Sequence, residues 1–224
     1  MTIEAVIFDR DGVLIDFDLA GASSFFQPIL PFPLPELFSR WLKWGDKVGF
    51  PASPVEEKSF FRGFWGELSD EFELSQAKRT QLYQFNYTRY LCPFPEVRPI
   101  LVEIRRRGLR IGVLSNFSLA TIESSLEAIG LLDLVDTACA AMVIGFAKPE
   151  PKAYLTVIQA LGTKPENCLL FDDKATHVKG GRAIGIHSYL VDRRRPDHDL
   201  EQGIVCDLAI IPTILEQYSQ DQGP

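Results

Sequence analysis

Residues Ile3–Leu14 read IEAVIFDRDGVL, and this stretch decides the fold class that we expect. The run from Ile3 to Phe8 is almost continuously apolar, which is typical of a parallel strand covered on both faces. Asp9 and Asp11 follow the run two residues apart, so a loop can turn both carboxylates toward one site. An Asp-Gly pair after a strand is by itself only a turn signal. The functional interpretation therefore depends on the rest of the chain.

Two later apolar runs also end in polar residues. Arg110–Leu114 precedes SNFS, and Cys168–Phe171 precedes DDK. Periodicity and glycine stops predict further elements, namely helices over Val97–Arg107, Ser118–Ile129 and Pro151–Leu161 and strands over Thr137–Ala141, Ser188–Val191 and Leu208–Ile211. This alternation predicts an α/β fold with a doubly wound parallel sheet. Ligands bind beyond the carboxyl ends of the strands in such sheets, so the polar strand ends are candidates for one shared site.

Residues 17–95 have a different character, because they hold 18 of the 25 aromatic residues. Helical patterns cover Glu36–Val48, Pro54–Ser69 and Ser75–Leu91. We predict that residues 17–95 form an inserted α-helical domain and that residues 1–16 and 96–224 form the α/β core. The aromatic residues are interpreted as the packing core of the helices, with a substrate-facing aromatic wall as the alternative.

Composition excludes several classes of protein. The 224 residues are 46% hydrophobic and 24% charged, which is enough apolar material for a packed core. The 30 acidic residues outnumber the 23 basic ones, which argues against a nucleic-acid partner. No uninterrupted run of about 18 apolar residues is present, so we expect no membrane partner. The four widely spaced cysteines and the absence of a signal-like start predict a cytoplasmic protein. The sequence leaves both a monomer and a homodimer open.

The polar strand ends together meet the needs of a phosphate site. A carboxylate repels a phosphate ester, by about 4 kcal/mol at about 4 Å and an effective dielectric of about 20. Such a site therefore needs a divalent cation and a fixed positive side chain. Asp172 and Asp173 offer the oxygen ligands that Mg²⁺ prefers, and Lys148 offers the positive charge. Ser115 and Asn116 offer a hydroxyl and backbone N–H groups at the start of a predicted helix, whose dipole favours anions.

The ordered set DRDGV, LSN, KPEP and FDD is similar to the four motifs of the haloacid dehalogenase superfamily. The resemblance extends from Ile3 to about Val191, and the insertion resembles the α-helical cap of the superfamily's first subfamily. It implies a Mg²⁺-dependent phosphatase that hydrolyses a small phosphomonoester, a small phosphorylated metabolite, through an aspartyl-phosphate intermediate. The identity of that metabolite is not encoded in these motifs.

The resemblance also implies a role for each motif residue. Asp9 would be the nucleophile, and Asp11 would act first as general acid and then as general base. Ser115, Lys148 and the backbone of Asn116 would bind the phosphoryl oxygens.

The same resemblance implies the ligands of Mg²⁺, which are the Asp9 carboxylate, the Asp11 main-chain carbonyl and one carboxylate of the fourth motif. We favour Asp173 as the direct ligand, with Asp172 beside it. His177 stands where related double-Asp motifs usually have Asn, and we expect it to join the hydrogen-bond network or to cap a helix.

Three other functions are weighed against this one. Haloacid dehalogenases place an aromatic residue where Asp11 stands, so Asp11 favours phosphoryl transfer. A phosphomutase of the β-phosphoglucomutase-like type usually follows the first motif with Asp-Thr and then His, whereas this chain has IDFDL over Ile15–Leu19. A non-catalytic binding protein would not need the intact acids and Lys148.

Two further patterns receive structural interpretations. The basic run Arg193–Arg195 is interpreted as a solvated loop. Gly180 and Gly181 are interpreted as a place where a helix packs closely, because no phosphate-loop motif accompanies them.

Overall fold

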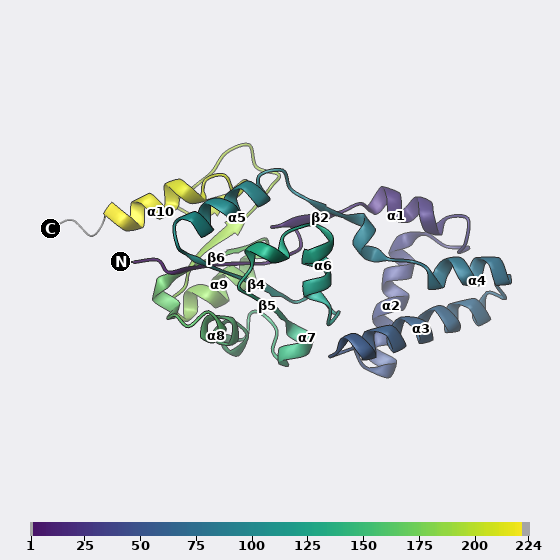
Figure 1. The fold of residues 1–224 in the computed structure, drawn as a ribbon. Helices are drawn as coiled ribbons and strands as arrows, with labels where there is room; N and C mark the ends of the chain where they lie inside the picture. The colour runs from purple at the N-terminus through teal and green to yellow at the C-terminus, as the bar shows by residue number, and fades with distance from the viewer. Residues whose placement is uncertain (1, 221–224) are drawn as a thin grey trace.

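The computed structural model describes residues 2–220, which form an α/β core joined to a lobe of helices (Figure 1). In spatial order, the strands of the core sheet are β5 (Thr137–Ala140), β4 (Arg110–Ser115), β1 (Ala5–Phe8), β6 (Cys168–Asp172), β7 (His187–Val191) and β8 (Ile204–Val205). Every neighbouring pair is parallel. The α/β fold with a parallel sheet is therefore confirmed.

The centre of the sheet is the point at which the chain changes direction across it. β1 pairs with β4 on one side and with β6 on the other, and Phe8 lies opposite Val113 and Phe171. After β4 the chain continues outward to β5 and then returns to the other side of β1. The carboxyl ends of β4, β1 and β6 therefore surround a topological switch point, where such sheets bind their ligands.

Helices cover both faces of the sheet (Figure 1). On one face are α5 (Val97–Arg106), α6 (Ile122–Ala128) and α10 (Ile211–Gln220), and on the other are α8 (Pro151–Ala160) and α9 (Ala175–Ala183). The side chains of β1 alternate between the two layers, with Val6 and Phe8 on the α5 side and Ala5 and Ile7 on the α8 side. This period of two explains why the strand is apolar throughout. The remaining core elements are the short α7 (Ala141–Ile144), η2 (Leu132–Leu134) and η3 (Pro165–Asn167).

The helical insert contains α1 (Leu19–Phe26), α2 (Leu34–Val48), α3 (Pro54–Glu71), α4 (Gln76–Tyr83) and η1 (Tyr87–Tyr90). The chain enters and leaves it through an antiparallel pair of short strands, β2 (Ile15–Phe17) and β3 (Leu91–Pro93). The insert has its own hydrophobic core, separate from the two layers around the sheet. Its helices all lie within residues 17–95, although the domain boundaries themselves stay a prediction.

Three predicted elements are wrong in extent or type. The helix predicted over Ser118–Ile129 begins only at Ile122, and the one predicted over Ser75–Leu91 ends at Tyr83. Asn86 then begins η1, because its carboxamide accepts a hydrogen bond from the Thr88 N–H at 3.0 Å. The strand predicted over Leu208–Ile211 is a turn that leads into α10. A short apolar run cannot distinguish a buried strand from the start of a buried helix.

No helix of the described residues is both long and apolar enough to span a membrane. All four cysteines are free thiols, as the sequence predicts. The compartment in which the protein works stays a prediction.

The close packing predicted for Gly180 and Gly181 is confirmed. A Cβ atom at Gly180 would lie 2.7 Å from Pro149 Cβ and 3.0 Å from the Pro149 carbonyl oxygen. Tyr154 of α8 donates a hydrogen bond to the carbonyl of His177 in α9 at 2.7 Å, so the two helices cannot easily separate. These glycines therefore bring α9 close to the loop that carries Lys148.

We predict that Gly180→Ala lowers the free energy of unfolding by about 1–3 kcal/mol, because the added methyl group overpacks against Pro149. Gly66→Ala in α3 is the matched control, since a Cβ there meets only Tyr83 Oη at 3.4 Å. The control should raise stability by up to about 1 kcal/mol through helix propensity. Urea unfolding measures both, and an equal gain for the two variants would contradict the close approach.

Candidate active site

Lys148 is the centre of a buried group of charges at the switch point. Its Nζ lies 2.9 Å from Asp9 Oδ1 and 2.7 Å from Asp172 Oδ2, and all three side chains are buried. Asp9 follows β1, Asp172 ends β6, and Lys148 lies in the loop before α8. Ile7 and Leu170 pack on the α8 face, so two residues later Asp9 and Asp172 point to that same face. The alternation of strand side chains thus directs both carboxylates toward the lysine.

Asp172 is fully engaged by its neighbours. His177 Nδ1 lies 3.0 Å from Asp172 Oδ1, and the backbone N–H of Lys174 donates to the same oxygen at 2.9 Å. With Lys148 on the other oxygen, the carboxylate is held from three sides. His177 therefore belongs to the hydrogen-bond network of the site, one of the two roles expected for it.

The charges of this group shift the pKa of each member. Burial raises the pKa of Asp9 from 3.8 to about 6, although Lys148 opposes that change. Burial alone would raise the pKa of Asp172, but His177 and Lys148 outweigh it and the pKa is lowered. Burial alone would lower the pKa of Lys148, but the two carboxylates outweigh it and the pKa is raised. Lys148 is therefore a fixed cation, and Asp172 is a fixed anion.

Asp173 is exposed, and its carboxylate is directed toward the same place. Single oxygens of Asp9, Asp172 and Asp173 all lie within 4.8 Å of one another. Gly12, at φ 75°, makes room for Asp173, because a Cβ there would lie 3.0 Å from Asp173 Oδ2. Three carboxylates and one ammonium group leave two negative charges, which one divalent cation would balance. The donor set consists of hard oxygens and therefore fits Mg²⁺. Which aspartates would bind it stays a prediction.

Ser115 and Asn116 lie at the end of β4, beside this group. The buried Ser115 Oγ accepts a hydrogen bond from the Phe117 N–H at 3.1 Å, which leaves its own proton free for a ligand. The Asn116 side chain binds the backbone of Lys148 on both sides, donating to its carbonyl at 2.7 Å and accepting from its N–H at 2.9 Å. Asn116 thus positions the lysine, a role that the sequence did not reveal.

The predicted help from a helix dipole at Ser115 and Asn116 is wrong. α6 begins at Ile122, and its N-terminal end is occupied by Glu57 of α3. Glu57 Oε2 accepts hydrogen bonds from the N–H groups of Ala120 and Thr121 at 2.9 and 3.0 Å, and its Oε1 accepts one from Thr121 Oγ1 at 2.6 Å. The Glu57 carboxylate of the helical insert, and not a substrate anion, therefore binds the N–H groups at the start of α6.

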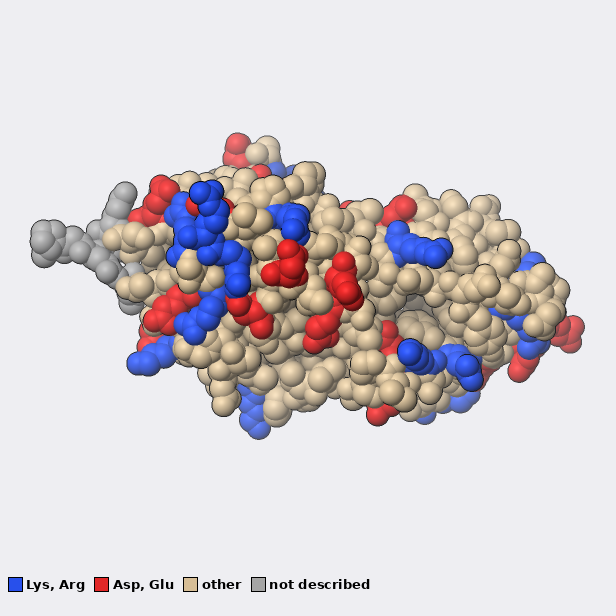
Figure 2. Space-filling model, in the orientation of Figure 1, with Lys and Arg blue, Asp and Glu red and all other residues tan. Residues whose placement is uncertain are grey.

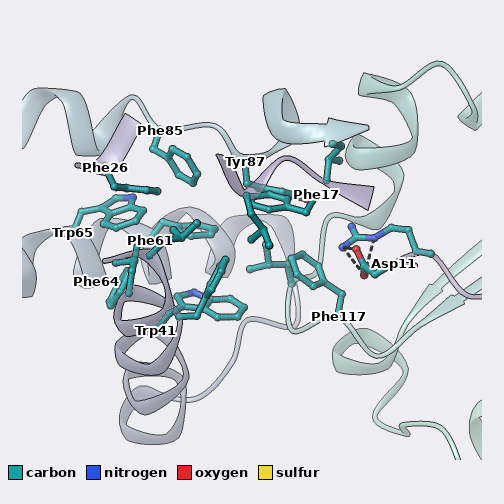
Figure 3. Close-up of a pocket in the computed structure, with 17 residues that line it drawn as sticks. Asp11, Phe17, Phe26, Trp41, Phe61, Phe64, Trp65, Phe85, Tyr87 and Phe117 are labelled. Carbon is teal, nitrogen blue, oxygen red and sulfur yellow. Dashed lines mark hydrogen bonds and ion pairs between the residues drawn. The ribbon is translucent and has the colours of Figure 1, made fainter. Parts of the chain in front are cut away.

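Arg10 is a residue of the candidate site that the sequence analysis missed. Its side chain is buried, and its Nη2 binds both carboxylate oxygens of Asp11 at 3.0 and 3.1 Å. Nη1 donates to Ser125 Oγ at 3.0 Å, and the group lies 4.0 Å from the Phe117 ring centre. Asp11 is therefore held at the boundary between the core and the helical insert (Figure 3). An arginine directly after a buried strand, between two acids, was the available signal.

Arg193 does not belong to a solvated loop, which corrects one interpretation of the sequence. Its Nε donates to the Gly12 carbonyl at 3.1 Å, and its Nη1 pairs with Glu96 at 2.7 Å. The guanidinium also lies 3.4 Å from the centre of the Phe94 ring. Arg193 therefore braces the turn after Asp11, whereas Arg194 is exposed as expected.

Comparison with known proteins agrees with this geometry. Residues 3–185 match the family of haloacid dehalogenase-like hydrolases. The chain is also 40% identical over 217 residues to Phosphatase MT3486 of Mycobacterium tuberculosis, covering 96% of this chain and 98% of that protein. The chain belongs to the haloacid dehalogenase-like hydrolases. It is an enzyme of the phosphatase-like kind within that family.

More distant relatives share the fold of this haloacid dehalogenase-like hydrolase. Hexitol phosphatase B of Escherichia coli is 25% identical over 197 residues, covering 88% of this chain and 87% of that protein. A HAD phosphatase from Thermococcus onnurineus has a TM-score of 0.62 at 22% identity, covering 95% and 98% of the two chains. A 2-haloacid dehalogenase from Pseudomonas syringae has a TM-score of 0.71 at 19% identity, covering 97% and 100%. At these identities, the two solved structures show the fold alone.

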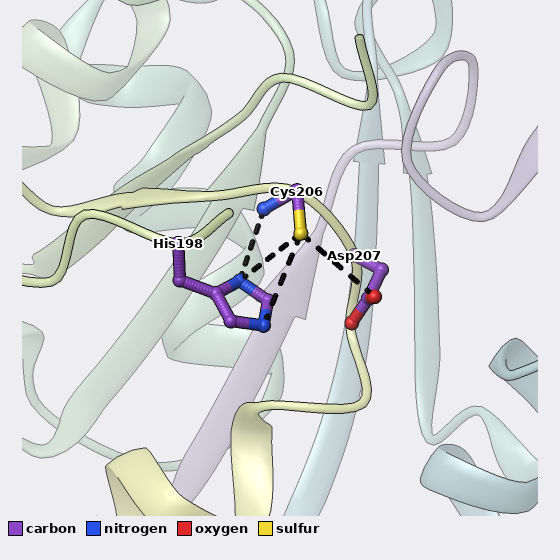
Figure 4. A group of neighbouring side chains, drawn as sticks. All are labelled: His198, Cys206 and Asp207. Carbon is purple, nitrogen blue, oxygen red and sulfur yellow. Dashed lines mark hydrogen bonds between the residues drawn. The ribbon is translucent and has the colours of Figure 1, made fainter. Parts of the chain in front are cut away.

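A second group of potential metal ligands lies beside the edge strand β8 (Figure 4). His198 Nδ1 accepts a hydrogen bond from the Cys206 N–H at 3.1 Å, and the Cys206 thiol lies 3.9 Å from Asp207 Oδ2. Partial burial and the Asp207 carboxylate raise the pKa of Cys206, which favours the neutral thiol over the thiolate that metals bind. These contacts connect His198, Cys206 and Asp207 within the loop beside β8.

We predict that Glu57→Ala lowers the free energy of unfolding by at least about 2 kcal/mol, because it leaves three donors at the start of α6 without a partner. Glu67→Ala in the same helix is the control. It removes only an exposed pair with Lys47 and should cost no more than about 1 kcal/mol. Thermal or urea unfolding compares the two, and equal losses would show that Glu57 does not join the insert to the core.

We also predict a pH dependence of stability that belongs to Asp9. The pKa of Asp9 is about 6 in the folded protein and 3.8 for an unperturbed carboxyl, which represents the unfolded chain. Between pH 3.8 and about 6, the folded state therefore binds the proton of Asp9 more tightly than the unfolded state does. This contribution to stability is complete below about pH 4 and is lost as the pH rises through about 6. The unfolding free energy of the wild type minus that of Asp9→Asn, measured in EDTA, should fall over that range. A difference in unfolding free energy that stays constant with pH would contradict a raised pKa of Asp9.

Proposed function

We propose that the protein is a phosphatase that hydrolyses a small phosphomonoester through an aspartyl-phosphate on Asp9, with Mg²⁺ as cofactor. The observation that carries this proposal is the buried ion pair between Lys148 and Asp9, with oxygens of Asp172 and Asp173 within 4.8 Å of one from Asp9. A pocket of about 350 Å³ opens onto this group and is lined by Asp9, Asp11 and Ser115 among others. The name of the Mycobacterium tuberculosis relative supports the same activity.

Mg²⁺ would be held by the carboxylates of Asp9 and Asp173 and by the main-chain carbonyl of Asp11. When bound, the ion supplies positive charge that offsets the repulsion between these acids and a phosphate.

The residues of the chain would carry the reaction itself. Lys148 holds Asp9 Oδ1, which leaves the other oxygen of Asp9 to attack phosphorus. The Ser115 hydroxyl donates to a phosphoryl oxygen, and Lys148 holds the charge that develops there. Asp11 gives a proton to the leaving alcohol and then takes one from the water that hydrolyses the aspartyl-phosphate. For this, Asp11 must exchange the hydrogen bonds of Arg10 for those of the leaving oxygen.

The helical insert would act as a cap over this pocket. Phe117 of the core packs against Trp41 and Tyr87 of the insert, with ring centres 6.3 and 5.8 Å apart. Glu57 fastens α3 to α6 beside these rings. A lobe attached in this way can exclude water from the aspartyl-phosphate and select the alcohol part of the substrate.

A nucleic-acid partner, a non-catalytic binding role and a phosphomutase activity have less support. The basic side chains of α5 pair with acids, as in Arg98–Asp133 and Arg107–Glu103, and Figure 2 shows red groups beside many of the blue ones on one face. This mixture of charges supports the expectation of no nucleic-acid partner. The intact buried charges argue against a non-catalytic binding protein, and a phosphomutase would release an isomer with little free phosphate.

We predict that Asp9→Asn lowers kcat for p-nitrophenyl phosphate with Mg²⁺ by at least about 10³-fold, because the nucleophile is lost. EDTA should abolish the wild-type activity, and added Mg²⁺ should restore it. Asp16→Asn is the matched control, since Asp16 lies in β2 and its carboxylate accepts a hydrogen bond only from the neighbouring Phe17 N–H. Equal activity of Asp9→Asn and the wild type would remove Asp9 from the role of nucleophile.

A further inference from the structure

The helical insert contains an apolar cavity of about 270 Å³ (Figure 3). Ten aromatic residues and five leucines line it, together with Arg10 and Asp11. In Figure 3 the rings of Trp41, Phe61 and Trp65 stand on the side of the insert, and Phe117 and Asp11 stand on the side of the core. The aromatic residues form the predicted packing core of the insert, and some of them also line this cavity. That they face a substrate stays a prediction.

The cavity adjoins the catalytic pocket. Asp11 and Phe117 line both, and the catalytic pocket also contains Asp9 and Ser115. If Asp11 protonates the leaving oxygen, as proposed above, then the group attached to that oxygen extends past Asp11 into the cavity. The walls of the cavity thus contact the alcohol part of the substrate and not its phosphate.

The walls offer a polar alcohol few hydrogen-bond partners. Apart from Arg10 and Asp11, the polar side-chain atoms in the lining belong to Trp41, Trp65 and Tyr87, and of these Trp41 Nε1 and Tyr87 Oη are buried without a partner among the described residues. A sugar or polyol would lose its hydration there, and each hydroxyl without a partner costs about 1–3 kcal/mol. An apolar group of the same size instead gains about 25 cal/mol for each Å² of surface removed from water.

The one cation in the lining, Arg10, already has partners in this structure. The Arg10 guanidinium is already bound by Asp11 and Ser125 and stacked on Phe117. A second anionic group on the substrate would compete with Asp11 for this guanidinium.

The volume sets the size of the group that fits. An apolar cavity of about 150 Å³ is enough to hold benzene. The cavity here is larger, about 270 Å³. It suits a linear or branched alkyl group of about 6–10 carbons, or two fused rings.

We propose that the substrate is a phosphate monoester of an apolar alcohol, with an alkyl or aromatic group that fills this cavity. The inference rests on the proposed phosphatase function and names its substrate class.

The test compares phosphate release from esters of primary alcohols, so that the leaving groups have similar reactivity. With Mg²⁺, hexyl phosphate should have a kcat/KM at least about 100-fold above that of glucitol 6-phosphate, from the gain of burying several methylene groups. If glucitol 6-phosphate is hydrolysed equally well or better, the phosphatase function stands and the apolar substrate class is overturned. If no ester is hydrolysed, the proposed function itself fails.

A variant connects the preference to the cavity. Phe38 lines the cavity and is 41% exposed, so Phe38→Asp adds a charge to the wall at a position that already contacts water. It should lower the ratio of kcat/KM for hexyl phosphate to that for methyl phosphate by at least about tenfold. Leu42→Asp in the same helix is the control, because Leu42 is 49% exposed and does not line the cavity. An unchanged ratio in Phe38→Asp would overturn the proposal.

A binding measurement on the wild-type protein gives an independent readout that no folding defect can affect. Trp41 and Trp65 line the cavity, so hexylphosphonate, which cannot be hydrolysed, should change the tryptophan fluorescence on binding. Methylphosphonate, which has the same charged group but cannot reach the cavity, should leave it unchanged. The same response to both compounds would contradict occupation of the cavity.

Discussion

The buried contact of Lys148 with Asp9 and Asp172 is the constraint on which the rest of this structure depends. An ammonium group without water is costly, and it is tolerated only where carboxylates and hydrogen bonds surround it closely. Here the carboxylates come from β1 and β6, and the lysine comes from the loop before α8. The Asn116 side chain at the end of β4 fixes that loop. Three separate parts of the chain must therefore be in register before the charges are satisfied.

A second ion pair, between Arg10 and Asp11, orients one acid of the first motif. Arg10 follows the nucleophile candidate directly, yet its guanidinium faces the insert and holds Asp11 there. The two acids of the first motif are thus divided between two environments, with Asp9 among charges and Asp11 at the edge of an apolar cavity. This division suits a reaction in which charge is transferred on one side and an apolar alcohol departs on the other. Glu57 keeps the insert in the position that this arrangement needs.

Local patterns were most informative where one physical effect decides the outcome. Ile3–Phe8 is apolar throughout because helices cover both faces of β1, and this pattern could be recognised without coordinates. The pattern of Leu208–Ile211 was ambiguous, since burial against the same core suits the start of a helix equally well. Ser118 to Thr121 is not helical, and the N–H groups of Ala120 and Thr121 instead donate to Glu57, about 60 residues earlier. Interactions between distant residues of this kind leave no local signal.

From the sequence alone came the parallel sheet, the helical insertion and the identity of the acids and the lysine that meet at the switch point. The sheet and the insertion follow from strand and helix periodicity, which is a property of neighbouring residues. The acids and the lysine were identified by the resemblance of four ordered motifs to the haloacid dehalogenase superfamily. Only the tertiary structure decided that Asp172 is engaged by Lys148 and His177 while Asp173 stays exposed, and that Arg10 holds Asp11. The cavity likewise exists only in three dimensions, because its volume is what remains after aromatic side chains from several helices have packed as closely as their shapes allow.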